Sequence, residues 1–262
     1  MNYQTIVYEK KNRTAWIYLN RPEDMNSLSK TLVIELLEVL QEVEKDESTQ
    51  VIVLSGKGKA FCAGADLKEL LADIEKKPDG QKEFLDYAGE LFGRLNHLSK
   101  PLIAALNGIT VAGGLEIAMT ADIVIASEKA KIGDAHSNFG VIPGGGGAVR
   151  LPRKIGINRA KYLLFTGDFI SAQEMKDYGF VNEVVPVDEL EGFVQEVADK
   201  ISAKSPLVLK EMKKLVTDGL EQPLDIALRQ ELLALKNHTR SHDFHEGLSA
   251  FSEKRTPNFK GY

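Results

Sequence analysis

A long apolar run, residues 101–126, limits what this chain can fold into more than any other stretch. It is long enough to raise the question of a membrane span, which needs about 20 apolar residues. However, the pairs Asn107-Gly108 and Gly113-Gly114 interrupt it, as do the charged residues Glu116 and Asp122. We therefore predict a buried strand, a turn, a helix and a second strand, with no membrane association.

Strands and helices alternate along most of the chain. Two units, Val51–Leu70 and Leu102–Met119, share the order of a strand, a turn of Gly and Ala, and a helix. Such alternation predicts an α/β core with parallel strands. Helical spacing of apolar residues dominates the end of the chain. We expect a core over residues 1–200 and a C-terminal helical region over residues 201–262.

The finer pattern predicts individual elements. We expect strands at Thr14–Asn20, which closes an N-terminal hairpin, at Gln50–Gly56 and at Gly179–Pro186. Helical periodicity predicts helices at Thr31–Glu47, Lys68–Leu98 with a break at Lys76–Gly80, Arg153–Phe165, Asp188–Ala203, Pro206–Leu220 and Pro223–Arg240, and a further one through Phe251.

Composition excludes several classes of protein. The 262 residues carry a formal net charge of -5, so no global positive field attracts nucleic acid or an anionic membrane. The single cysteine, Cys62, cannot form an intramolecular disulfide, which fits a reducing compartment. The N-terminus lacks the apolar segment of a signal peptide. We expect a cytoplasmic protein with no nucleic-acid partner.

The two Gly/Ala turns are a candidate oxyanion site. They read "AFCAGADL" and "VAGGLEIAM", and small residues let a ligand approach the backbone. The first N–H groups of a helix have no internal acceptor and stabilise negative charge. If the two strands are neighbours, Ala65 and Gly113 can each direct an N–H at one oxygen. The alternative is that both turns only connect strands to helices.

Glu116 is the only charged residue in the run 101–121. It lies three residues after Gly113, so its carboxylate shares a helix face with that N–H group. A buried, unpaired carboxylate tends to have a raised pKa, which suits a general acid or base near neutral pH. Pairing with a buried Arg or Lys as a packing element is the alternative.

Six segments together resemble the crotonase, or enoyl-CoA hydratase/isomerase, superfamily. They are "AFCAGADL", "NGITVAGGLEIAMTADIVIAS", "IPGGGGAVRLPR", "FTGDFISAQEM", "GFVNEVVP" and "EGLSAFSEKRTPNF", and they occur in order over almost the whole chain. The resemblance implies a spiral of ββα units and a C-terminal helical region that trimerises, often into a dimer of trimers.

The resemblance also implies the ligand, an acyl-CoA thioester. Its thioester oxygen would be held by the N–H groups of Ala65 and Gly113, so that an enolate forms. The phosphates and adenine of CoA would lie near Ala63, Asp66, Leu67 and Lys68. Phe251 and Lys254 would complete the CoA site, within one subunit or across a subunit boundary. No metal or redox cofactor is implied.

The chain departs from the family pattern at one expected catalytic position. Hydratases of the family carry a second carboxylate in a segment resembling "FGxPExxLGxxPG", whereas this chain reads "IGDAHSNFGVIPG" and places His136 there. His136 either replaces the second carboxylate, since imidazole titrates near neutral pH, or only shapes the pocket. Asp134 precedes it by two residues and could orient it.

The reaction that we expect is water addition to a 2,3-enoyl-CoA. Retention of the first carboxylate, Glu116, favours hydration over double-bond migration, because family isomerases usually rely on the second position. An isomerase, a decarboxylase, a thioester hydrolase or a dehalogenase of the same superfamily stays open. So does a different class, a non-catalytic protein that binds acyl-CoA or RNA.

Three other signals are interpreted as structural. The segment "GGGGAVRLPRKIG" lacks the βαβ context of a dinucleotide loop and predicts a turn that begins a helix beside the acyl pocket. His238, His242 and His245 have helical spacing, but no Cys or acidic cluster supports a metal site. Cys62 has no evident base and is expected to fill space in the core.

Overall fold

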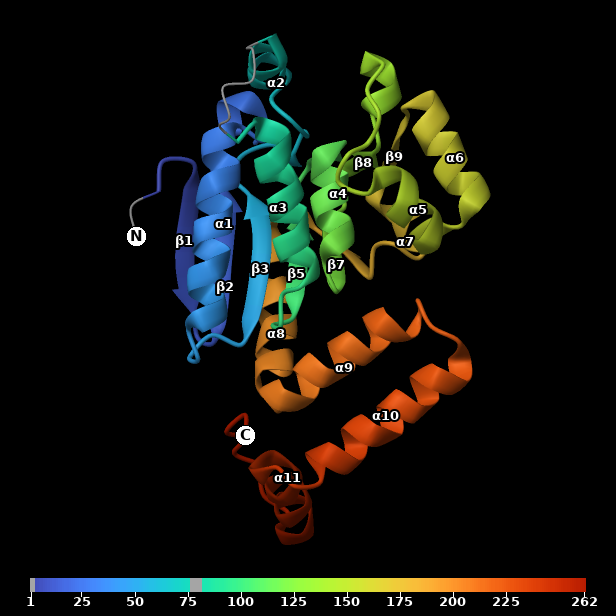
Figure 1. Ribbon diagram of the computed structural model, residues 1–262. Helices are drawn as coiled ribbons and strands as arrows, with labels where there is room; N and C mark the ends of the chain where they lie inside the picture. Colours follow the sequence, from blue (N-terminus) through green and yellow to red (C-terminus); the bar gives the residue numbers. More distant parts are fainter. Residues whose placement is uncertain (1–2, 76–81) are drawn as a thin grey trace.

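The computed structural model describes residues 3–75 and 82–262 (Figure 1). The predicted break at Lys76–Gly80 lies outside the described residues. The strands are β1 (Ile6–Lys11), β2 (Thr14–Leu19), β3 (Val51–Gly56), β4 (Ala60–Cys62), β5 (Leu102–Leu106), β6 (Ile109–Val111), β7 (Ile123–Ser127), β8 (Lys131–Gly133), β9 (Phe169–Ser171) and β10 (Glu183–Val185).

The helices follow the same chain order. They are α1 (Lys30–Lys45), α2 (Leu67–Glu75), α3 (Phe84–Asn96), α4 (Gly113–Thr120), α5 (Gly147–Ile155), α6 (Ile157–Thr166), α7 (Ala172–Asp177), α8 (Leu190–Ser202), α9 (Pro206–Gly219), α10 (Leu224–His238) and α11 (His242–Glu253). Short 3-10 helices are η1 (Pro22–Asp24), η2 (His136–Phe139) and η3 (Val187–Glu189).

The strands form two sheets whose order follows a spiral. The larger sheet has the order β1-β2-β3-β5-β7-β10 and the smaller one β4-β6-β8-β9. In the units β3-β4, β5-β6 and β7-β8, the first strand joins the larger sheet and the second joins the smaller one. Strands from successive units pair in parallel, whereas β1-β2 and β8-β9 are antiparallel. The predicted spiral of ββα units, the N-terminal hairpin and the parallel core are confirmed.

Helices cover both faces of the larger sheet. Ile17 of β2 packs into the core cluster that includes residues of α1 and α3, whereas Trp16 packs into the cluster with α8. Figure 1 shows α1 and α3 in front of this sheet. Because both faces are covered, every residue of β2, β3 and β5 is buried. Strands of this kind read as continuous apolar runs without alternation.

Local signals account for the start of α1. Ser29 precedes the helix, and its side chain accepts a hydrogen bond from Leu32 N at 3.1 Å. An N-cap of this type satisfies one of the N–H groups that the first turn leaves free. Leu36 and Leu40 then continue the buried stripe toward the core. The predicted helix at Thr31–Glu47 is therefore confirmed, with a start one residue earlier and an end two residues earlier.

The structure differs from the sequence prediction at short elements. The strands β4, β6, β8 and β9 have three residues each, too few to show a period of two, and the sequence pattern does not predict them. The predicted single helix at Arg153–Phe165 is wrong, since α5 ends and α6 begins at Gly156. Gly156 has φ of 86°, which a helix interior does not accept.

The helices α9, α10 and α11 extend away from the two sheets (Figure 1). Lys213 of α9 ties this region to the core, because its Nζ lies 2.7 Å from the Asp122 carboxylate and donates to the carbonyl of Lys100. Asp243 of α11 accepts hydrogen bonds from the N–H groups of Lys260 and Gly261, which holds the last residues against that helix. Within the described ranges, no helix combines the length and apolar character needed to cross a bilayer.

We predict that Gly114→Ala destabilises the fold. A β-carbon at Gly114 would lie 2.1 Å from the carbonyl oxygen of Cys62, so α4 and β4 would have to separate. Overpacking of this kind costs about 1–3 kcal/mol or more in the free energy of unfolding, measured by urea denaturation. Gly89→Ala is the matched control, because that helical position has open space around it and should gain about 0.5–1 kcal/mol. Equal stability of the two variants would contradict the prediction.

Candidate active site

Three parallel neighbours in the smaller sheet bring the candidate residues together. The strands β4, β6 and β8 pair in that order, so their carboxyl ends meet at one edge. Ala65 follows β4, Gly113 follows β6, and His136 follows β8. Residues far apart in the sequence thus reach one site because of the spiral.

The two Gly/Ala turns touch each other. A β-carbon at Gly113 would lie 3.3 Å from Gly64 Cα and 3.6 Å from Ala65 N. Leu28 forms a parallel bridge with Ala65, in which Leu28 N donates to the Gly64 carbonyl and Asp66 N donates to the Leu28 carbonyl. Successive backbone groups along an extended segment point to opposite sides. The Gly64 carbonyl and the Asp66 N–H point toward Leu28, so the N–H of Ala65 points away from it. Two backbone donors therefore lie side by side at the site.

Ala112 holds a strained backbone conformation immediately before α4. Its φ of 49° and ψ of -123° are unusual for a residue with a side chain, and such conformations cost about 1–3 kcal/mol. The N–H of Ala112 donates to the carbonyl of Gly133 at 3.2 Å, which ties the strained residue to the end of β8. The sharp turn sets the direction of the Gly113 N–H, the first in its helix.

Glu116 lies inside the protein with 3% of its surface exposed. One carboxylate oxygen, Oε1, accepts hydrogen bonds from Gly145 N at 2.7 Å and from Gly147 N at 2.8 Å. Burial raises the pKa of Glu116, although these two hydrogen bonds and the nearby His136 oppose the rise. Within the described part of the chain, no Arg or Lys forms an ion pair with this carboxylate, so the packing alternative lacks its partner.

His136 stands opposite the second oxygen of Glu116. Its Nε2 lies 3.8 Å from Glu116 Oε2, while its Nδ1 lies 2.9 Å from Asp134 Oδ1. Burial lowers the pKa of His136, but the hydrogen bond and charge of Asp134 and the charge of Glu116 outweigh it, and the net shift is upward. Asp134, which by its spacing could orient His136, does contact the ring.

The arrangement leaves two proton-carrying atoms facing one small space. Oε1 of Glu116 is occupied by backbone donors, so Oε2 is its free oxygen. Nε2 of His136 is the ring nitrogen that Asp134 does not contact. A distance of 3.8 Å is too long for a hydrogen bond but short enough for both atoms to contact one water or substrate oxygen. Such a pair can take up and deliver protons within one site.

The residues predicted to bind CoA fall into two groups. Ala63, Asp66, Leu67 and Lys68 lie at the turn after β4 and the start of α2. Phe251 and Lys254 lie on and just after α11, and α2 and α11 are at opposite ends of the molecule (Figure 1). One chain therefore does not bring the two groups together.

Asp66 has a structural partner of its own. Its carboxylate lies 3.1 Å from the Arg21 guanidinium and accepts hydrogen bonds from the N–H groups of Lys68 and Glu69 at the start of α2. Burial alone would raise the pKa of Asp66, but these contacts hold it below its ordinary value. The side chain of Asp66 thus shapes the loop, whereas Leu67 and Lys68 are exposed beside it.

The other sequence signals take local roles. Cys62 is fully buried, and burial raises the pKa of its thiol to about 12, which fits the prediction of a core residue. Nδ1 of His238 contacts the Ser241 hydroxyl and Nδ1 of His242 contacts Asp243. Across residues 3–75 and 82–262, no group of three or more His, Cys, Asp or Glu side chains is placed to hold a metal ion.

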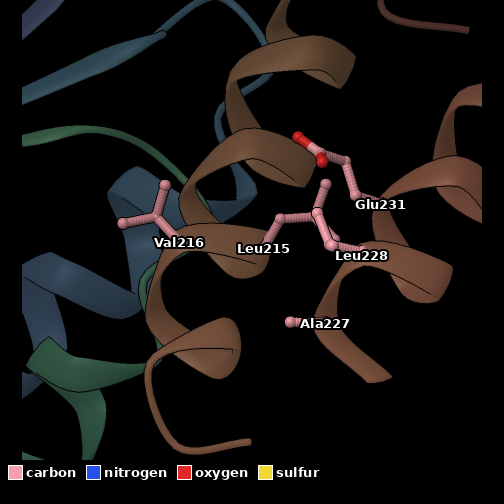
Figure 2. A pocket seen from close by; sticks show the side chains of 5 residues that line it. All are labelled: Leu215, Val216, Ala227, Leu228 and Glu231. Carbon is pink, nitrogen blue, oxygen red and sulfur yellow. The ribbon is translucent and has the colours of Figure 1, made fainter. Parts of the chain in front are cut away.

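A shallow hollow between α9 and α10 lies in the tail rather than near Glu116. Figure 2 shows Leu215 of α9 and Leu228 of α10 in the space between the two helices, with Glu231 at its rim. Its lining is mainly aliphatic and includes none of the predicted catalytic residues. We assign this hollow to helix packing.

Sequence reasoning missed the two residues that bind the carboxylate of Glu116. Gly145 and Gly147 belong to the glycine-rich segment that was interpreted only as a turn beginning a helix. That turn exists, since Gly147 is the first residue of α5. Four consecutive glycines, Gly144–Gly147, are a signal for close backbone approach, but they do not show which group approaches.

We predict that Glu116→Gln changes how stability depends on pH. The pKa of Glu116 is higher in the folded chain than in the unfolded one, so wild-type stability falls as pH rises through the interval between the two values. The variant does not lose stability in this way, because Gln does not titrate. Glu116 also contributes to the raised pKa of His136, and that contribution likewise makes wild-type stability fall as pH rises, so its removal acts in the same direction.

Urea denaturation at about pH 4.5 and about pH 8 measures the effect, with protein concentration held constant. The variant should gain stability relative to wild type at the higher pH. Glu128→Gln, which removes an exposed carboxylate, is the control with which the change in Glu116→Gln is compared. Parallel curves for Glu116→Gln and wild type would disprove the assigned pKa shift.

Comparison with known proteins agrees with this architecture. The family model for enoyl-CoA hydratase/isomerase matches residues 9–262. A crotonyl-CoA hydratase of Syntrophomonas wolfei is 36% identical over 262 residues, covering 99% of each chain. A short-chain-enoyl-CoA hydratase of Clostridium acetobutylicum is 36% identical over 256 residues, covering 97% of each.

Solved structures give the same result. The crystal structure of an enoyl-CoA hydratase from Bacillus anthracis superposes with a TM-score of 0.91 at 39% identity, covering 99% of this chain and 100% of that one. A second hydratase structure, from Polaromonas sp. JS666, has a TM-score of 0.92 at 28% identity. The match extends over the sheets, the spiral and the tail helices alike, and this chain belongs to the enoyl-CoA hydratase/isomerase family of the crotonase superfamily.

Proposed function

We propose that this protein is an enoyl-CoA hydratase that adds water across the 2,3-double bond of a short 2-enoyl-CoA. One observation carries the proposal: Glu116 Oε2 and His136 Nε2 face each other at 3.8 Å beside the touching turns of Ala65 and Gly113. Relatives named crotonyl-CoA hydratase and short-chain-enoyl-CoA hydratase support the substrate class.

The reaction follows from these groups. The thioester oxygen accepts hydrogen bonds from the N–H groups of Ala65 and Gly113, which stabilise the enolate that forms when C3 is attacked. A water between Glu116 Oε2 and His136 Nε2 directs its two O–H bonds at these acceptors and a lone pair at C3. Its oxygen bonds to C3 as one proton passes to the pair. The pair then returns a proton to C2, so the elements of water are added and the enzyme is regenerated.

The charge of the pair suits this cycle. Burial raises the pKa of Glu116, which favours uptake of a proton by its carboxylate during the cycle, and His136 can take up a proton as imidazolium. No redox cofactor is needed, because the addition of water changes no oxidation state overall, and the N–H groups of Ala65 and Gly113 polarise the thioester oxygen in place of a metal ion. Coenzyme A enters only as part of the substrate.

The CoA portion is proposed to bind along the turn after β4 and the start of α2. The backbone of Ala63 and Asp66 and the exposed Leu67 and Lys68 would face it, with Lys68 supplying positive charge to the phosphates. The carboxylate of Asp66 itself stays with Arg21.

We further propose that the chain works as a homo-oligomer, a trimer or a dimer of trimers. Large apolar side chains are exposed on the tail in the single chain, among them Val216, Leu220, Leu224, Leu228, Leu232 and Leu248. Exposed apolar surface of this extent is typical of an interface. An oligomer would bring Phe251, which is 85% exposed here, and Lys254 to the CoA site of another subunit. The division at residues 200 and 201 and a cytoplasmic location stay predictions.

A turnover screen tests the reaction. With a trans-2-enoyl-CoA, we expect loss of the conjugated double bond and appearance of a 3-hydroxyacyl-CoA. Migration of the double bond in a cis-3-enoyl-CoA, without water addition, would instead identify an isomerase. Release of free CoA or of carbon dioxide would identify a hydrolase or a decarboxylase. Saturable acyl-CoA binding with no turnover of any thioester would identify a binding protein.

We predict that Glu116→Gln and His136→Ala each lower kcat by about 10²- to 10⁴-fold, because each removes a proton carrier. The amide of Gln keeps an oxygen for the N–H groups of Gly145 and Gly147, so binding of substrate should persist. Steady-state kinetics over a range of pH measure both effects. Glu128→Gln and His97→Ala, at exposed positions, are the matched controls and should retain wild-type rates. A His136→Ala profile that overlays that of wild type would reduce His136 to a structural residue.

A further inference from the structure

We propose that Asp134 is the positioning residue for His136: its carboxylate accepts the Nδ1 proton of the imidazole and thereby keeps Nε2, the nitrogen that faces Glu116 Oε2, as an acceptor for a proton of water. This inference deepens the proposed function and rests on it for the role of the ring as a base. Asp134 itself touches no reacting atom and acts only through His136.

The hydrogen-bond chemistry fixes the direction of the contact. Nδ1 of His136 lies 2.9 Å from Asp134 Oδ1, and an ionised carboxylate can only accept. Nδ1 must therefore carry the proton. A neutral imidazole has one N–H, so Nε2 is left with a lone pair, and this is the atom that lies 3.8 Å from Glu116 Oε2.

The backbone around Asp134 holds the ring in place. Oδ1 also accepts a hydrogen bond from the backbone N of His136 at 3.2 Å, so one carboxylate oxygen contacts both the main chain and the side chain of the same residue. Ala135 between them has φ of 65°, a left-handed conformation that makes the tight turn. The His136 ring thus has little freedom to rotate away from Glu116.

The burial of Asp134 is hard to explain by the turn alone. The residue is fully buried, and among the described residues its Oδ2 has no hydrogen-bond partner. An unsatisfied buried carboxylate oxygen is costly, and a neutral Asn would accept the backbone N–H of His136 equally well. What Asn cannot supply is a negative charge beside Nδ1. We infer that the negative charge of Asp134 acts on the His136 ring and is not needed for the turn.

One glycine separates the two carboxylates of this arrangement. Gly147 donates its N–H to Glu116 Oε1, and a β-carbon at Gly147 would lie 2.9 Å from Asp134 Oδ2. The charged groups that act on the His136 ring are therefore Asp134, from the same segment, and Glu116, from α4. Asp134 and Glu116 contact opposite nitrogens of the ring.

The first test needs no substitution at Asp134. Protein with histidine labelled by ¹⁵N in the ring shows by NMR which nitrogen carries the proton, and the loss of one set of signals in His136→Ala assigns His136. We expect the neutral ring to carry its proton on Nδ1. A proton on Nε2 would overturn the proposal. This measurement stands whether or not the protein hydrates an enoyl-CoA, so it separates a failure of this inference from a failure of the proposed function.

The second test uses Asp134→Asn, which keeps the turn and removes the charge. We expect the pKa of His136 in the NMR titration to fall, and the acid limb of the kcat/KM profile to move to lower pH, because the imidazolium loses its partner. We also expect kcat to fall about 10²-fold, since Nε2 is no longer held as the acceptor for the proton of water. Asp168→Asn, which removes an exposed carboxylate, is the matched control with an unchanged profile. An unchanged His136 pKa and kcat in Asp134→Asn would overturn the proposal.

Discussion

Close backbone contact around β4 is the constraint on which the rest of the structure depends. A β-carbon at Gly56, Gly108 or Gly114 would lie 2.2, 2.0 or 2.1 Å from a main-chain carbonyl oxygen of residues 59–62. These glycines belong to the end of β3, the turn before β6 and the start of α4. Only hydrogen in place of a side chain lets successive ββα units stack at this separation. The edge where the candidate catalytic groups meet exists because the units stack so closely.

At this site one carboxylate faces one imidazole. Two carboxylates at the same two positions would repel each other. Two like charges a few ångströms apart force one of them to stay protonated. With His136 beside Glu116, one proton shared by the two side chains gives either two neutral groups or an ion pair. The second carboxylate, Asp134, lies on the opposite side of the ring. The glycine loop contributes backbone donors, which add no titrating group of their own.

Sequence reasoning predicted the architecture well where a pattern spans many residues. The helix at Thr31–Glu47 and the long tail helices show apolar periodicity, and the buried parallel strands show continuous apolar runs. Sequence reasoning failed where a feature depends on contacts between residues that are distant in the sequence. Three-residue strands such as β4 carry no period, and nothing local indicates that Gly145 and Gly147 bind Glu116. The proximity of Glu116 to His136 could be expected only from family resemblance, because 20 residues and a crossover between sheets separate them.

The two hydrogen bonds from Gly145 and Gly147 to Glu116 couple the glycine loop to a proton. They favour the ionised carboxylate, so any displacement of the loop raises the pKa of Glu116 further. Thermodynamic linkage makes the effect reciprocal: protonation of Glu116 weakens the attachment of the loop by the same free energy. Ile142, two residues before Gly144, the first glycine of the loop, is 85% exposed, so the segment that leads into the loop lies at the surface. The position of the glycine loop and the acidity of the Glu116 carboxylate are thereby parts of one equilibrium.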